Sequence, residues 1–153
     1  MGVNIPGIEP LCLKVMHNKR HFGSILSEIK SLKALDGVAG LPRVLGFSAR
    51  PAAYLMTRHG TTTLDRLVSP GAISEAQLAR ILVQLVTIVE DVHAAGYLHN
   101  DLYEDQVAVT FDGAEVEVTL LDLGYVTAIG GRPFKANAAK CKTARDLELL
   151  MEK

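Results

Sequence analysis

The chain has 153 residues, of which 48% are hydrophobic and 22% are charged, a composition typical of one globular domain. Its formal net charge of -1 lacks the basic footprint of a general nucleic-acid binder, so no nucleic-acid partner is expected. Cys12 and Cys141 stand far apart and show no metal-binding spacing, which favours a reducing, cytoplasmic location. Charged side chains interrupt the longest apolar run, 79–98, so we expect no membrane span.

The first predicted strand covers residues 9–17, a largely apolar run with Lys14 in its middle. A buried ammonium is costly unless it is paired. Taken alone, Lys14 is therefore most simply interpreted as a solvent-exposed lysine on an edge strand. A paired lysine is the alternative.

A helix is predicted over residues 24–35, with Ser24 as its N-cap. The spacing of Ile25, Ile29 and Leu32 places these side chains on one apolar face. Glu28 on the same helix either pairs with Lys14 or stays solvated on the polar face.

Residues 43–60 predict two strands joined around Arg50 and Pro51. A short helix is predicted over 61–67. A long helix should follow from Ser74, which can form a capping box with Gln77, to about Ala95. This long helix has a wide apolar face that includes Leu78, Ile81, Leu82, Leu85, Ile88, Val89 and Val92.

The stretch 98–124 places His99 and Asp101 after the long helix and ends in Asp122 and Gly124. Between them, Asp112-Gly113 predicts a tight hairpin turn, so the two carboxylates should reach neighbouring loop ends. That arrangement suits phosphoryl transfer, in which one carboxylate lies beside the attacking hydroxyl and another holds a metal. Each short motif taken alone is also compatible with an ordinary polar loop.

These motifs resemble the protein kinase superfamily. The run HNDLYEDQ followed by DLG is similar to H-R-D-L-x-x-x-N followed by D-F-G, and LCLK at 11–14 is similar to V-A-I-K. The resemblance implies an α+β, protein-kinase-like fold in a single domain over 1–153. A small β-rich N-lobe would cover 1–57 and a mainly helical, truncated C-lobe would cover 58–153.

The resemblance also implies roles for individual residues. Asp101 would orient the substrate hydroxyl or accept its proton, while Lys14 contacts the phosphates and Glu28 holds Lys14. Mg²⁺ would be held by Asp122 and Gln106. The ATP pocket would be formed by Lys14, Cys12, Met56, Thr57 and His59.

Several positions depart from the family pattern. Gln106 stands where the family has Asn, which puts the second magnesium in doubt. Asn100 replaces the arginine that grips an activation-loop phosphate, which argues against regulation by phosphorylation there. No Gly-rich loop precedes Lys14, which should weaken phosphate binding. A last helix is predicted over 143–152, where Asp146 resembles the start of the central large-lobe helix.

Three functions follow from these observations. The first is transfer of the ATP γ-phosphate to a protein hydroxyl, of the Ser/Thr type, with ATP and Mg²⁺ as cofactors. The second is a pseudokinase that acts as a nucleotide-binding or protein-binding scaffold. The third is a small-molecule kinase of the aminoglycoside-phosphotransferase type. The long apolar helix would lack its usual cover, so we expect a homodimer or a protein partner on its surface.

Overall fold

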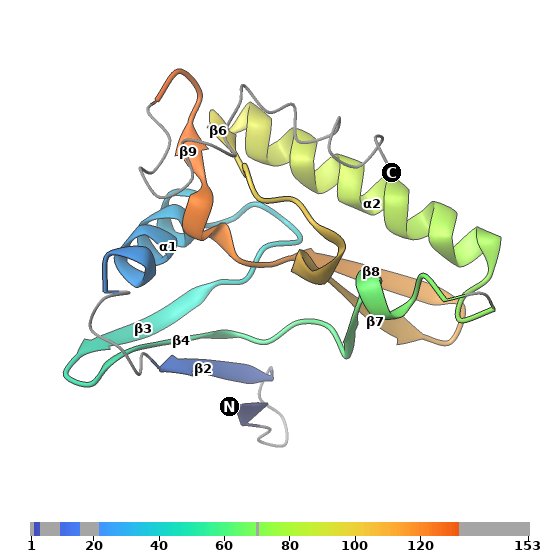
Figure 1. The fold of residues 1–153 in the computed structure, drawn as a ribbon, viewed down its shortest axis with the longest axis horizontal. Coiled ribbons are helices and arrows are strands. Elements are labelled where there is room, and N and C mark those ends of the chain that lie inside the picture. Colours follow the sequence, from blue (N-terminus) through green and yellow to red (C-terminus); the bar gives the residue numbers. More distant parts are fainter. Residues whose placement is uncertain (1, 4–9, 16–21, 70, 132–153) are drawn as a thin grey trace.

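The computed structural model describes residues 2–3, 10–15, 22–69 and 71–131, and they form an α+β fold (Figure 1). The first part is an antiparallel sheet with the strand order β1-β2-β4-β3. Helix α1 lies against one side of this sheet (Figure 1). The elements are β1 (Gly2–Val3), β2 (Leu11–Val15), α1 (Phe22–Ala34), β3 (Val44–Ala49) and β4 (Ala52–Thr57).

Helix α1 begins at Phe22, two residues before the predicted start. Ser24 therefore lies inside the helix, and its prediction as N-cap is wrong. The predicted apolar face is confirmed, because Ile25, Ile29 and Leu32 are all buried. Periodicity thus located the buried face, whereas the end of the helix depends on local geometry that periodicity does not record.

Helix α2 (Glu75–Ala94) begins with the predicted capping box. The Gln77 amide N–H donates to the Ser74 hydroxyl at 3.2 Å, and the Ser74 amide N–H donates to the Gln77 side chain at 2.9 Å. Gly96 follows the helix with a positive φ of 88°, a conformation that glycine adopts without steric cost. Both predicted ends of this helix are therefore confirmed to within a residue or two.

The buried face of α2 is narrower than predicted. Leu78 and Leu82 were expected on it, but they are 39% and 43% exposed, and Val83 and Val86 are exposed as well. One side of the helix packs against strand β8 (Glu115–Leu120), so side chains on the neighbouring side of the helix remain in solvent. The buried residues of α2 are Ile81, Leu85, Ile88, Val89 and Val92.

The predicted hairpin is present in a second sheet, of order β5-β7-β8. A two-residue turn with Gly113 at a φ of 59° joins its strands, as the Asp-Gly signal predicts. The short helix predicted over 61–67 is confirmed only as a 3₁₀ helix, Leu64–Arg66, which follows a two-residue strand. The strands are β5 (Thr62–Thr63), β7 (Val107–Asp112) and β8 (Glu115–Leu120), and a separate pair is formed by β6 (Tyr97–Leu98) and β9 (Thr127–Ala128).

One polar side chain of α2 holds the outer strand of the hairpin. The Gln84 amide donates to the Val116 carbonyl at 2.6 Å and accepts from the Val118 N–H at 3.1 Å. Strand β8 is at the edge of its sheet, so these bonds satisfy backbone groups that would otherwise have no strand partner. Helix α2 consequently runs along the hairpin (Figure 1).

Among the described residues, no helix combines the length and the apolar character that a membrane crossing requires. The helix predicted over 143–152, with Asp146, lies outside the described residues.

Candidate active site

The best-defined contact in the site is an ion pair between strand β2 and helix α1. The Lys14 Nζ lies 2.7 and 2.9 Å from the two carboxylate oxygens of Glu28. The Glu28 side chain is 5% exposed, whereas that of Lys14 is 42% exposed. The predicted pair is therefore formed, and a solvated Glu28 is excluded. The Glu28 carboxylate is thus buried, while the Lys14 side chain remains partly exposed to solvent.

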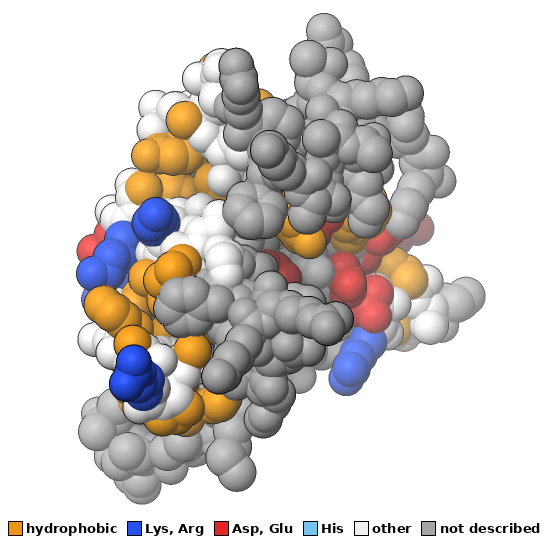
Figure 2. Space-filling view, turned by 60° about the vertical axis from the view of Figure 1, so that its left-hand side comes forward, with side chains coloured by type: hydrophobic (Ala, Val, Ile, Leu, Met, Phe, Trp, Pro, Cys, Tyr) orange, Lys and Arg blue, Asp and Glu red, His pale blue; other side chains and the backbone are white. Residues whose placement is uncertain are grey.

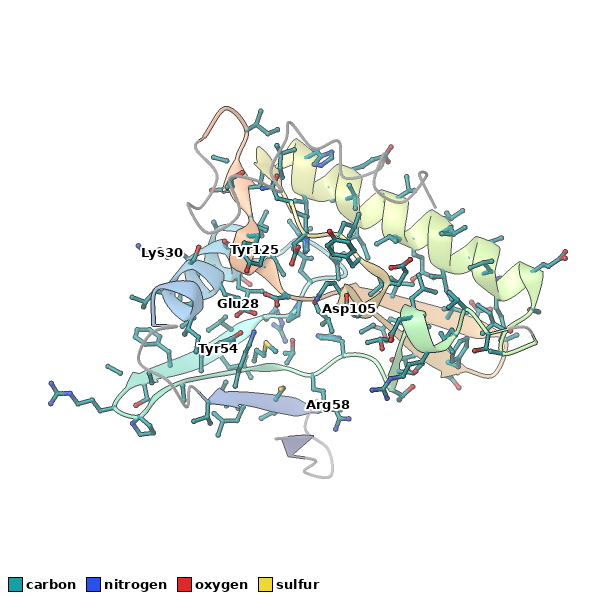
Figure 3. All side chains as sticks on the ribbon, viewed as in Figure 1. Glu28, Lys30, Tyr54, Arg58, Asp105 and Tyr125 are labelled. Carbon is teal, nitrogen blue, oxygen red and sulfur yellow. The ribbon has the colours of Figure 1, made fainter. Side chains whose placement is uncertain are left out.

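Tyr54 on β4 lies beside this pair, and the motif comparison did not identify it. It is the strand partner of Lys14 in the β2–β4 register, and the Lys14 Nζ lies 5.9 Å from the centre of its ring. Figure 3 shows Glu28 and Tyr54 between the helix and the sheet. Burial raises the pKa of the Tyr54 phenol, and the negative charges of Glu28 and Asp122 raise it further. The phenol is therefore a neutral donor, 1% exposed.

The predicted nucleotide-pocket residues lie around the same strands. Cys12 and Met56 are partners in the β2–β4 register and both are half-buried. Thr57 is buried, and its hydroxyl contacts the Arg43 N–H at 2.9 Å and the His59 ring at 2.7 Å. The Thr57 hydroxyl is thus engaged within the protein, and the Thr57 backbone N–H is engaged as well, because it donates to the Arg43 carbonyl at 3.0 Å.

The segment after β4 crosses close over the hairpin at Gly60. This residue has a φ of +76°, and a Cβ placed there would lie 2.5 Å from the Cβ of Ala108. A side chain is excluded on both counts. Sequence reasoning missed this position, because a single glycine in a loop does not indicate which strand it approaches.

Two buried side chains hold the loop that carries Asp101. A ring nitrogen of His99 lies 3.1 Å from the Leu121 carbonyl, which ties the loop to the residue before Asp122. The Asn100 amide donates to the carbonyls of Leu98 and Tyr125, at 3.2 and 3.0 Å, and to the Thr127 hydroxyl at 2.9 Å. These contacts bring the Asp101 loop and the Asp122 loop side by side, as predicted.

The backbone at both loops is in the left-handed region. Asn100 has a φ of 64° and Asp122 a φ of 53°, conformations that cost energy for residues other than glycine and that cluster at functional sites. The Asp122 carboxylate accepts from the Gly124 N–H at 3.3 Å, which orients the side chain. The chain therefore maintains strained geometry at both of the carboxylate-bearing loops.

A backbone hydrogen bond places Gln106 next to the loop that carries Asp122. The Leu121 N–H donates to the Gln106 carbonyl at 2.7 Å, so Gln106 adjoins the strand end that carries Asp122. With Asp101 it lines a cavity of about 410 Å³, whose other lining residues are Asp65, Tyr103, Glu104 and Asp105. The cavity is strongly acidic, and acidic side chains also gather in one part of the face in Figure 2.

Whether this site can bind magnesium depends on the number of protein ligands that the ion requires. Within the described residues, no group of three or more His, Cys, Asp or Glu side chains could hold a metal ion. Mg²⁺ is commonly bound by one or two carboxylates together with substrate phosphates, and the oriented Asp122 carboxylate fits that mode. The residues present therefore fit an ion that takes one protein carboxylate as a ligand.

The comparisons with known proteins agree with this geometry. The chain matches no protein-family profile. It is 23% identical over 124 residues to human serine/threonine-protein kinase H1, covering 78% of the chain and 29% of that protein. It is 23% identical over 159 residues to casein kinase I homolog 3 of Schizosaccharomyces pombe, with 97% and 36% covered. For calcium-dependent protein kinase SK5 of Glycine max the identity is 27% over 124 residues, with 79% and 23% covered.

Among solved structures, the chain is similar to the crystal structure of the Rad53 kinase domain and SCD2. The TM-score is 0.67 at 21% identity, and the match covers 78% of this chain and 45% of the other. The fold is therefore the α+β fold of protein kinases. The chain spans little more than a third, or less, of the length of the curated kinases it matches.

Proposed function

We propose that this chain binds ATP with Mg²⁺ and transfers the γ-phosphate to a protein hydroxyl. The observation that carries the proposal is the Lys14–Glu28 ion pair, formed at 2.7 Å with Glu28 buried and Lys14 open to solvent. An active kinase site needs this pair in place.

The roles follow from the positions of the side chains. Lys14 would neutralise charge on the phosphates, and Asp122 would hold Mg²⁺, which supplies further neutralisation of the transferred group when bound. Asp101, which lines the acidic cavity, would accept a hydrogen bond from the substrate hydroxyl and orient it for attack. Cys12 and Met56 would contact the adenine.

A pseudokinase is the alternative that one observation favours. Gln106 replaces the metal-binding Asn, and its backbone carbonyl is committed to the Leu121 N–H at 2.7 Å. The longer glutamine side chain must then reach a metal from a fixed backbone position. A chain that binds nucleotide but fails to transfer phosphate would fit this arrangement.

The test is thermal unfolding with and without ATP and Mg²⁺, followed by a phosphotransfer assay with protein acceptors. A ligand that binds the native state raises the midpoint by mass action. We expect a magnesium-dependent rise in the wild type that Lys14→Ala and Asp122→Asn abolish. Asp101→Asn should keep the rise and lose transfer, because that carboxylate acts on the acceptor and not on ATP.

Each result decides between the candidates. A rise together with transfer that Asp101→Asn abolishes supports the phosphotransferase. A rise without transfer favours the pseudokinase. The absence of any rise at millimolar ATP would contradict both nucleotide-binding proposals and leave a protein-binding scaffold.

We also propose that the exposed row on α2 contacts a second copy of the chain or a protein partner. Leu78, Leu82, Val83 and Val86 form this row and are 37–66% exposed, and exposed apolar patches commonly mark interfaces. Light scattering should show a mass that rises with concentration and falls back to the monomer in Leu82→Glu. A constant monomer mass would contradict the self-association.

A further inference from the structure

One buried hydroxyl next to the ion pair lacks a hydrogen-bond partner among the described residues. It belongs to Tyr54, which is 1% exposed. In addition to burial, Glu28 raises the pKa of the Tyr54 phenol by its charge and by hydrogen bonding, so the two groups lie within reach of each other, although the hydroxyl has no partner at hydrogen-bond geometry in the structure. Both Glu28 oxygens are instead engaged by the Lys14 ammonium, at 2.9 and 2.7 Å.

This arrangement is unfavourable if the hydroxyl serves packing alone. A buried hydroxyl without a partner costs folding free energy, and phenylalanine would fill the same space without that cost. The ring accounts for the contact with Lys14, whose Nζ lies 5.9 Å from the ring centre. The ring does not account for the hydroxyl, which therefore requires a reason beyond packing.

The Lys14 ammonium suggests that reason, because it has three hydrogens to distribute. In the structure it contacts both oxygens of Glu28, and its side chain is 42% exposed toward solvent. Phosphate oxygens arriving from the solvent side would draw hydrogens away from Glu28. At least one oxygen of a buried carboxylate would then need another donor.

We infer that Tyr54 is a positioning residue that donates its hydroxyl to Glu28 when Lys14 turns toward the phosphates of a bound nucleotide. The Glu28 carboxylate would then hold two donors, Lys14 on one oxygen and Tyr54 on the other. Lys14 could be shared with the phosphates without leaving a buried acceptor unsatisfied. This inference rests on the proposed nucleotide binding.

Tyr54→Phe tests it, because the variant removes one oxygen and keeps the ring. Without nucleotide, the unfolding midpoint should stay the same or rise, since an unpaired buried hydroxyl is gone. The Kd for ATP with Mg²⁺, measured by calorimetry, should rise about tenfold or more, as expected for the loss of one hydrogen bond to a charged carboxylate. Tyr97→Phe, which removes a half-buried phenol on β6, is the matched control and should leave the Kd unchanged.

The two readouts separate the possible outcomes. A higher Kd with an unchanged or higher midpoint supports the inference, because the loss of a purely structural hydroxyl would lower the midpoint. An unchanged Kd in Tyr54→Phe, with wild-type binding that Lys14→Ala abolishes, overturns the role of Tyr54 and leaves the proposed function intact. A higher Kd together with a lower midpoint also overturns it, in favour of a structural role. Absence of wild-type binding overturns the proposed function and this inference with it.

Discussion

The two halves of the candidate site are held by different kinds of contact. Lys14 and Glu28 are held by side chains that bond to each other across β2 and α1. Asp101 and Asp122 are placed by His99 and Asn100, whose buried side chains bond mainly to backbone carbonyls. The ion pair can therefore exchange partners, whereas the loop network has backbone groups that must stay satisfied.

The difference shows which half can respond to a ligand. Lys14, whose side chain is 42% exposed, can exchange a contact with Glu28 for a contact with phosphate or water. A buried carbonyl that loses its donor has no such alternative. We therefore expect the loop half to determine stability and the ion-pair half to determine affinity, and substitutions in the two halves test that expectation.

The largest effect on stability is expected for Asn100→Ala. The variant removes the amide shared by Leu98, Tyr125 and Thr127 and places alanine at a φ of 64°. We expect a loss of about 3 kcal/mol in the free energy of unfolding, from unsatisfied carbonyls together with left-handed strain. Urea denaturation would measure it.

Asn100→Gly separates these two causes. It loses the same hydrogen bonds but adopts positive φ without strain, so it should be about 1 kcal/mol more stable than Asn100→Ala. Equal stability of the two variants would show that the left-handed backbone contributes nothing. If both variants were as stable as the wild type, the expectation that the loop half determines stability would be contradicted.

A smaller effect on stability is expected for Lys14→Ala. The lysine side chain is 42% exposed, so solvent screening weakens the pair itself, but the variant leaves the buried Glu28 carboxylate without its donor, and we expect a loss of about 2 kcal/mol. The same urea titration should therefore show a smaller shift than that of Asn100→Ala, although nucleotide binding is lost. A destabilisation that equals or exceeds that of Asn100→Ala would mean that the ion pair also holds the fold.

Much of the fold could be predicted because its signals are local. The capping box at Ser74, the Asp112-Gly113 turn and the apolar spacing of α1 each depend on residues a few positions apart. The predicted N-cap at Ser24 was wrong, and the helix predicted over 61–67 was too long, because helix ends carry weak signals. Leu78 and Leu82 were assigned to the buried face because periodicity gives a direction but not the width of the partner that covers it.

The sequence by itself determined which residue types stand where, and thereby the resemblance that singled out Lys14, Glu28, Asp101 and Asp122. It also determined the helix and the hairpin that flank the two aspartates. The tertiary structure alone decided that Tyr54 lies opposite Lys14 and beside Glu28, and that Asn100 bonds to residues 25 and 27 positions away. Those contacts depend on strand register and on chain segments remote in sequence, and no local pattern of residues encodes either one.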